Sequence, residues 1–136
     1  MERDLHPFEV EIATRFGIRG KWAASPKSEW IRGYLLTFGE GYGYEMWKRY
    51  CEFARYLGIR PGTYISFARH MWLLKRLGLI RPVKIKPRPG GFPKKVYRIV
   101  PGMEDSPLWR RPMQAMYPTT DWTRPERKRV YREKYR

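Results

Sequence analysis

The sequence predicts an α+β fold that is mainly helical, with three helices followed by a β-hairpin. Apolar residues recur at three- and four-residue steps in the segments 28–38, 44–57 and 63–77, which is the pattern of helices with one buried face. Two short segments after them, 83–86 and 96–100, are expected to be strands joined by a turn rich in Pro and Gly. A chain of 136 residues with 42% apolar residues supports one domain with a real core.

The first half of the chain is divided by clear start and stop signals. Residues 1–27 are expected to form an N-terminal arm, in which Pro7 to Phe16 can be a short helix. Ser28 can cap the first helix of the domain, and the run Gly39-Glu-Gly-Tyr-Gly43 breaks it. The second helix, 44–57, places Cys51 on its inner face, where we expect a small apolar core residue.

The third helix has the strongest pattern in the chain. Thr63 is the expected N-cap, and Gly78 supplies the stop at its other end. Its apolar stripe consists of Tyr64, Phe67, Met71, Leu74 and Leu77. The opposite face carries Ile65, Arg69, Trp72 and Arg76.

A helix that ends in Leu77-Gly-Leu-Ile80 and leads directly into a basic hairpin resembles the recognition helix and wing of a winged helix-turn-helix domain. The resemblance covers residues 28–100 and depends mostly on 58–100. It implies three helices, a β-hairpin wing and binding to nucleic acid. Two features depart from the family: Ile65 and Trp72 lie on the usually polar recognition face, and the wing is rich in proline. Simple reading of base edges is therefore not implied.

Charge is the strongest global indication of a partner. The net charge is +16, which in a domain of this size usually indicates a polyanion, most often nucleic acid. The alternative is that like charge only keeps the protein soluble. Residues 1–60 carry ten basic and eight acidic side chains, residues 61–105 ten and two, and residues 106–136 nine and three. The positive charge thus belongs to the third helix, the hairpin and a basic C-terminal extension, 101–136.

The candidate contacts to nucleic acid lie in these three segments. On the helix and in the hairpin they are Arg69, Trp72, Arg76, Arg81, Lys84, Lys86, Arg88, Phe92, Lys94, Lys95 and Arg98. In the extension, which is expected to leave the domain after Val100, they are Arg110, Arg111, Arg127, Lys128 and Arg129. Cations in such positions replace the counterions of a phosphate backbone. Trp72 either stacks on a base or sugar, or is covered by the arm or the extension, and the same alternatives hold for Phe92.

Catalysis, metals and small-molecule ligands are not indicated. The two histidines, His6 and His70, have no Cys or carboxylate at ligand spacing, and His70 is expected to be a hydrogen-bonded packing residue. We therefore expect no enzyme activity, no cofactor and no metal site. The single cysteine, the polar N-terminus and the short apolar runs predict a soluble cytoplasmic protein without a membrane segment. The absence of Asn and the presence of one Gln suggest a thermophilic source.

Two functions remain open from the sequence. The favoured one is a structural RNA-binding component of a ribosome or other ribonucleoprotein particle, contacting structured RNA and neighbouring proteins. Missing amide side chains argue against adenine reading in a major groove, whereas Arg, Lys, Tyr and Trp suit RNA backbone and stacking contacts. The alternative is a winged-helix protein on duplex DNA, either a transcription regulator or a packaging factor of the nucleoid. We expect a chain lacking residues 106–136 to remain folded.

Overall fold

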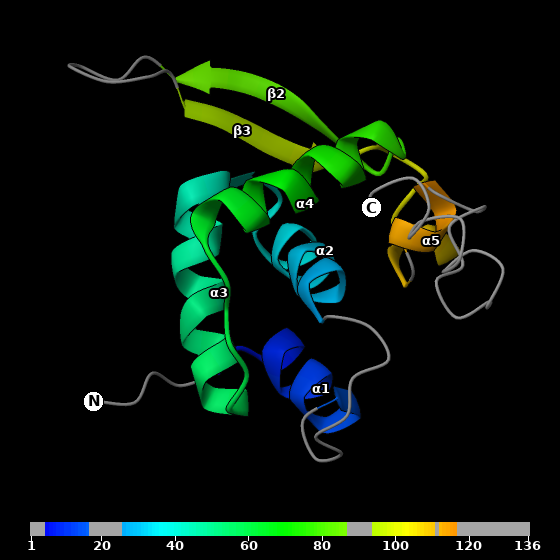
Figure 1. The fold of residues 1–136 in the computed structure, drawn as a ribbon. Helices are drawn as coiled ribbons and strands as arrows, with labels where there is room; N and C mark the ends of the chain where they lie inside the picture. Colours follow the sequence, from blue (N-terminus) through cyan, green and yellow to red (C-terminus); the bar gives the residue numbers. More distant parts are fainter. Residues whose placement is uncertain (1–4, 17–25, 87–93, 111, 117–136) are drawn as a thin grey trace, which may run out of the picture.

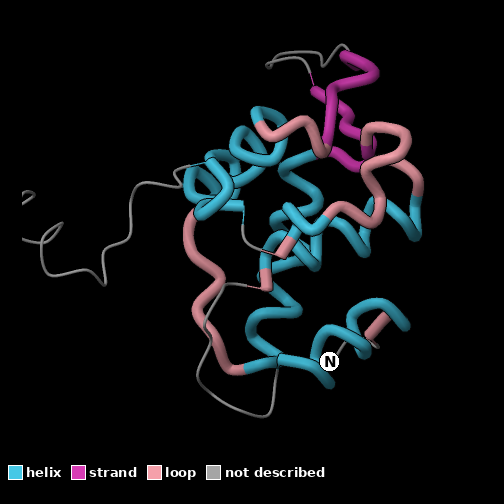
Figure 2. Tube along the Cα trace, turned by 90° about the vertical axis from the view of Figure 1, so that its right-hand side faces the viewer, coloured by secondary structure: helices cyan, strands magenta, loops and turns pink. Residues whose placement is uncertain are grey.

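The computed structural model describes residues 5–16, 26–86, 94–110 and 112–116 (Figure 1). Its elements in chain order are α1 (Pro7–Phe16), α2 (Lys27–Phe38), β1 (Gly41–Tyr42), α3 (Gly43–Leu57), α4 (Tyr64–Arg76), β2 (Ile80–Lys86), β3 (Lys94–Ile99), the 3-10 helix η1 (Pro107–Trp109) and α5 (Pro112–Met116). The prediction of an α+β, mainly helical fold is confirmed. Figures 1 and 2 show the β2–β3 hairpin at one end of the helical body and α1 at the other.

Local signals in the sequence set the bounds of α4. The Thr63 hydroxyl accepts a hydrogen bond from the Ser66 amide at 3.1 Å, so the predicted N-cap is confirmed. Beyond the helix, Gly78 has a φ of 77°, a left-handed conformation that costs other residues strain. The Leu79 amide then donates to the carbonyl of Leu74 at 3.0 Å. This short link passes α4 directly into β2.

The sheet has three strands rather than the two that the sequence predicted. All pairs are antiparallel, and the order is β1-β3-β2. β1 consists of Gly41 and Tyr42, which pair with Tyr97 and Val96. From the sequence, this stretch was expected only to break a helix, because two residues are too few to show the alternating pattern of a strand. β2 and β3 are also longer and shifted relative to the predicted 83–86 and 96–100.

The core lies between α2, α3, α4 and the inner side of the sheet. Its largest fully buried side chains include Trp30 of α2, Tyr50 and Phe53 of α3, and Phe67 and Leu74 of α4. Burial of Cys51 is confirmed. Such side chains each stabilise the fold by about 1.5–3 kcal/mol through apolar burial.

The segment expected to be an N-terminal arm contributes to the same core. Ile12 of α1 is buried, and so is the carboxylate of Glu9. That carboxylate accepts hydrogen bonds from Trp30 Nε1 at 2.9 Å and from the His6 amide at 3.1 Å. Because a buried carboxylate requires such partners, α1 is fixed against α2 through this contact.

The chain after Val100 also packs back onto the core. Trp109 in η1 is 1% exposed, and its Nε1 donates to the carbonyl of Met103 at 2.7 Å. Arg32 of α2 holds the same segment from the other side, donating to the carbonyl of Glu104 at 2.6 Å and to the carboxylate of Asp105 at 2.9 Å. The expectation that the chain leaves the domain at residue 101 is therefore wrong for residues 101–110.

Candidate nucleic-acid interface

The outer face of α4 is exposed among the described residues. Ile65 and Trp72 are 65% and 52% exposed, and Arg69 and Arg76 also face solvent. The inner stripe is buried at Phe67, Met71 and Leu74 but not at its first position, Tyr64, which lies in the first turn. Of the two alternatives for Trp72, burial beneath the described parts of the arm and the extension is excluded.

Trp72 and Arg76 form a pair on this face. The guanidinium carbon of Arg76 lies 5.7 Å from the centroid of the indole, one helical turn apart. A flat guanidinium beside an exposed indole presents two planar groups, and both kinds of plane stack on nucleobases. The pair also limits the rotamers that the two long side chains sample.

The outer face of the sheet gathers most of the hairpin cations. In the β2–β3 register, Arg81 is opposite Arg98 and Lys86 is opposite Lys94. Directly opposite residues share a face, and residues two apart in one strand share it too. The face that includes Val96 therefore carries Arg81, Lys84, Lys94 and Arg98. The side chain of Lys86, another predicted contact, lies outside the description. Tyr97 and Ile99 point to the other face and pack on the core.

Two of these cations have acidic partners that the sequence analysis missed. Lys84 Nζ is 3.2 Å from a carboxylate oxygen of Glu40, and Lys94 Nζ is 3.9 Å from one of Glu45. The acids come from the β1 region, far from the hairpin in sequence, and only the β1–β3 pairing brings them close. Exposed pairs of this kind contribute about 0–1 kcal/mol each, so a phosphate can replace the carboxylate at little cost.

The surroundings of Arg81 and Arg98 differ from those of Lys84 and Lys94. They are opposite each other on neighbouring strands and line a hollow of about 310 Å³ together with Gly39, whose carbonyl accepts from Arg98 Nε at 3.3 Å. Like charges directly opposite in a sheet are unfavourable. Glu104 also lines this hollow, and its negative charge offsets part of that repulsion. A bound phosphate would offset more of it.

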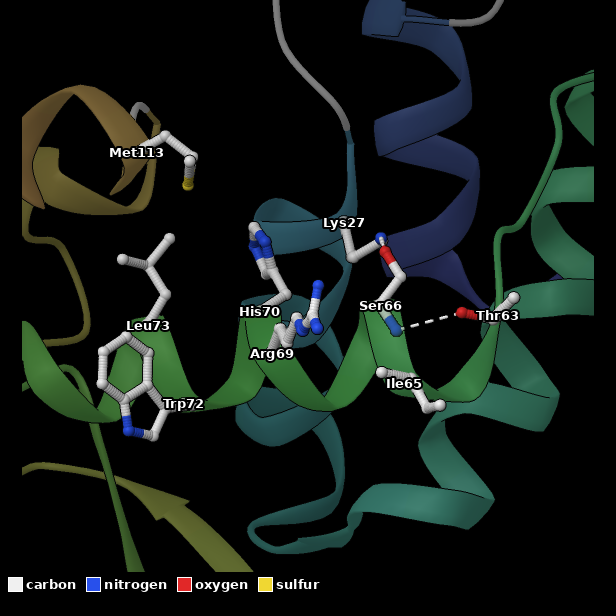
Figure 3. Close-up of a pocket in the computed structure, with 9 residues that line it drawn as sticks. All are labelled: Lys27, Thr63, Ile65, Ser66, Arg69, His70, Trp72, Leu73 and Met113. Atoms are coloured by element: carbon white, nitrogen blue, oxygen red, sulfur yellow. Dashed lines mark hydrogen bonds between the residues drawn. The ribbon is translucent and has the colours of Figure 1, made fainter. Parts of the chain in front are cut away.

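A groove of about 550 Å³ runs along the outer side of α4 (Figure 3). Lys27 at the start of α2 lies at one end, next to Ser66, with 3.4 Å between its Nζ and the Ser66 hydroxyl oxygen. Met113 of α5 lies at the other end, across from Leu73. The remaining lining residues are Thr63, Ile65, Arg69, His70 and Trp72. The groove therefore combines apolar and cationic groups.

Burial changes the acid–base properties of two groups at this groove. The pKa of His70 is lowered to about 4, first because burial disfavours the imidazolium and second because Lys27 is near. His70 is thus neutral at pH 7 and shares a hydrogen bond with the Ser28 hydroxyl, which confirms its prediction as a hydrogen-bonded packing residue. Burial also lowers the pKa of Lys27. A phosphate beside Lys27 would stabilise the ammonium form.

An aromatic cluster lies where α3, α4 and β1 meet. Tyr44, Trp47 and Tyr64 pack with ring centroids 5.4–5.7 Å apart, and Lys94 Nζ lies 4.7 Å from the centroid of Tyr42. Burial, then the neighbouring Tyr42 and Tyr44, raise the pKa of Tyr64. Trp47 Nε1 is buried and has no hydrogen-bond partner among the described residues. This cluster was not predicted, because the only sign of it in the local sequence is the pair of tyrosines at 42 and 44.

Several predicted contacts lie outside the described residues. They are Arg88, Phe92, Arg111, Arg127, Lys128 and Arg129. Lys95 lies on the opposite face of β3 from Lys94 and is exposed, and Arg110 is exposed directly after η1.

Within the described ranges, no group of three or more His, Cys, Asp or Glu side chains is placed to hold a metal ion. No helix in the same ranges is long and apolar enough to cross a membrane. Comparisons with protein-family models, with curated proteins and with solved structures found no match to this chain.

Proposed function

We propose that this chain is a non-catalytic nucleic-acid-binding protein that contacts structured RNA through α4, the β2–β3 hairpin and the C-terminal extension. The observation that carries the proposal is the segregation of cations on surfaces that point away from the core. Arg69 and Arg76 lie on the outer face of α4, and four cations with described side chains lie on the outer face of the sheet. A surface of this kind neutralises phosphates and releases their counterions.

The proposed fold is a winged helix in which α4 is the recognition helix and β2–β3 the wing. Support comes from the direct passage of α4 through Gly78 into β2, and from the order of α2, α3 and α4 before the hairpin. Its outer helix face has Ile65 and Trp72 where base-reading polar side chains would be expected. The face therefore suits stacking and backbone contacts better than the reading of base edges.

The choice of RNA over DNA depends on the whole chain. Nine basic side chains in residues 106–136 extend the charge beyond the helix and the hairpin, as expected of a component that crosses between RNA segments. In this proposal the protein resides in the cytoplasm within a ribonucleoprotein particle, where it also contacts neighbouring proteins. Duplex DNA, with a role in regulation or in the nucleoid, is the second candidate, because a helix followed by a hairpin is the arrangement of duplex-binding domains.

The test is binding of the purified chain to a structured RNA and to duplex DNA of equal length at several salt concentrations. If about six phosphates are neutralised, log affinity should fall against log salt with a slope near −4 to −5. Arg69→Ala with Arg76→Ala should weaken binding, whereas Arg55→Ala with Arg60→Ala, two exposed cations of α3 and the following turn, should not. A flat salt dependence, or equal losses from both double variants, would refute the proposal. Tighter binding to DNA at every salt concentration would favour the second candidate.

A further inference from the structure

The groove on the outer side of α4 combines the two kinds of group that recognise a single nucleotide. Trp72 and Met113 lie on opposite sides of Leu73, and these three side chains form an apolar surface at one end (Figure 3). Arg69 and Lys27 add cationic groups toward the other end. Its volume of about 550 Å³ is within the range of about 300–1,000 Å³ typical of small-ligand sites.

The exposure of Trp72 indicates which part of a nucleic acid fits here. A base within a duplex offers its flat face only to its neighbours in the stack. An indole can therefore stack only on a base that is unpaired or at the end of a helix, as in RNA loops and bulges. Trp72 is 52% exposed although it is the largest side chain on this face, and Arg76 lies beside it as a second plane.

The cations are placed for the phosphates of the same nucleotide. Arg69 is one turn before Leu73 on α4 and is exposed, and Lys27 reaches the groove from the start of α2. The Lys27 ammonium is held 3.4 Å from the Ser66 hydroxyl and 5.9 Å from the Tyr50 ring centroid, so it is fixed in position before a ligand arrives. Fixed donors bind phosphate with a smaller entropy loss than mobile ones.

We propose that the groove between Lys27, Trp72 and Met113 binds one unpaired nucleotide of an RNA, with the base on Trp72 and the phosphate at Arg69 and Lys27. The inference rests on the proposed function and makes it more specific, because it assigns α4 to a bulge or loop rather than to a continuous duplex. The β2–β3 hairpin then contacts the adjoining backbone. Met113, which is 60% exposed and flexible, adjusts to bases of different size.

The experiment compares an RNA hairpin that has a single unpaired adenosine with the fully paired hairpin of the same length. Trp72→Leu, which keeps an apolar side chain but loses the ring, should weaken binding to the bulged RNA about 5- to 100-fold, the range measured for loss of one stacked base. Binding to the paired RNA should change less than about 2-fold. Trp72→Phe should restore most of the affinity for the bulged RNA.

A second measurement reports stacking directly. With 2-aminopurine at the unpaired position, binding of the full chain should quench its fluorescence, and Trp72→Leu should abolish the quenching. Tyr56→Leu is the matched control, because Tyr56 is 61% exposed on α3 and does not line the groove. Circular dichroism of each variant confirms that it remains folded.

The failures of the two proposals are distinguishable. Salt-dependent binding of both RNAs with equal losses from Trp72→Leu would overturn the nucleotide site and leave the nucleic-acid interface intact. If Trp72→Leu caused no loss of affinity for the bulged RNA, the nucleotide site would also be overturned. The groove would then be open to another occupant, such as a protein. Absence of salt-dependent binding to either RNA would refute the proposed function itself.

Discussion

Replacing Trp109 with alanine is expected to lower the free energy of unfolding by about 3–5 kcal/mol, the usual cost of deleting a buried aromatic side chain. The indole is 1% exposed and belongs to the core cluster, next to α2. Its deletion also removes the indole donor at 2.7 Å from the Met103 carbonyl, which keeps only the Ser106 amide at 3.3 Å. That loss is part of the same cost and contributes about 1 kcal/mol.

Thermal unfolding followed by circular dichroism measures the effect. For a domain of this size each kcal/mol shifts Tm by roughly 4 °C, so Tm should fall by roughly 12–20 °C. Tyr56→Ala, at a position that is 61% exposed, is the control and should change stability by less than about 0.5 kcal/mol.

Two truncations extend the same test to the chain that follows Val100. A chain ending at Met116 should retain the stability of the full chain, whereas a chain ending at Asp105 should lose at least as much as Trp109→Ala. We therefore no longer expect a chain that lacks residues 106–136 to keep the stability of the full chain. A Trp109→Ala variant within about 1 kcal/mol of the unmodified chain would show that the core ends at Val100 and that the reasoning is wrong.

Three further predictions follow from the structure. Lys94→Ala with Lys95→Ala should weaken binding to every RNA sequence alike in filter-binding assays, because both cations are expected to contact backbone; a sequence-dependent loss would contradict this. The pKa of His70 is lowered to about 4 in the folded chain but returns to its ordinary 6.5 on unfolding. The free energy of unfolding should therefore fall by at most about 3 kcal/mol as the pH falls from 6.5 toward 4. In urea titrations, His70→Gln should flatten that pH dependence. Gly33→Ala should cost about 1–3 kcal/mol in urea unfolding, since its Cβ would lie 2.5 Å from the Phe8 ring, and an unchanged midpoint would mean that α1 moves freely on α2.

The helices were predictable because their signals are local. The cap at Thr63 and the stripe of Phe67, Met71 and Leu74 lie within a few turns of one another, so periodicity and capping chemistry were sufficient to define α4 and its exposed face. The exposure of Trp72 agrees with the same periodicity, since its position is on the face opposite the stripe.

The features that sequence reasoning missed depend on contacts between distant segments. β1 is only two residues long and is stabilised by pairing with β3, so nothing in its own sequence marks it as a strand. The pairs of Lys84 with Glu40 and of Lys94 with Glu45 exist only because of that pairing. The burial of Trp109 likewise depends on a hollow made by other helices, and an isolated Trp between prolines is equally consistent with an exposed anchor.

The open edge of the sheet has a consequence for association between copies of this chain. In the order β1-β3-β2, the long strand β2 has no neighbour on one side within the part of the chain that the structure describes, and it exposes Val83 and Ile85. A flat apolar edge of this kind is a template for strand addition and aggregation. Here Pro82 removes one amide donor, the bulge between Pro82 and Lys84 distorts the strand, and flanking cations repel an identical edge. A protein that carries such an edge can therefore accumulate at high concentration without polymerising through its sheet.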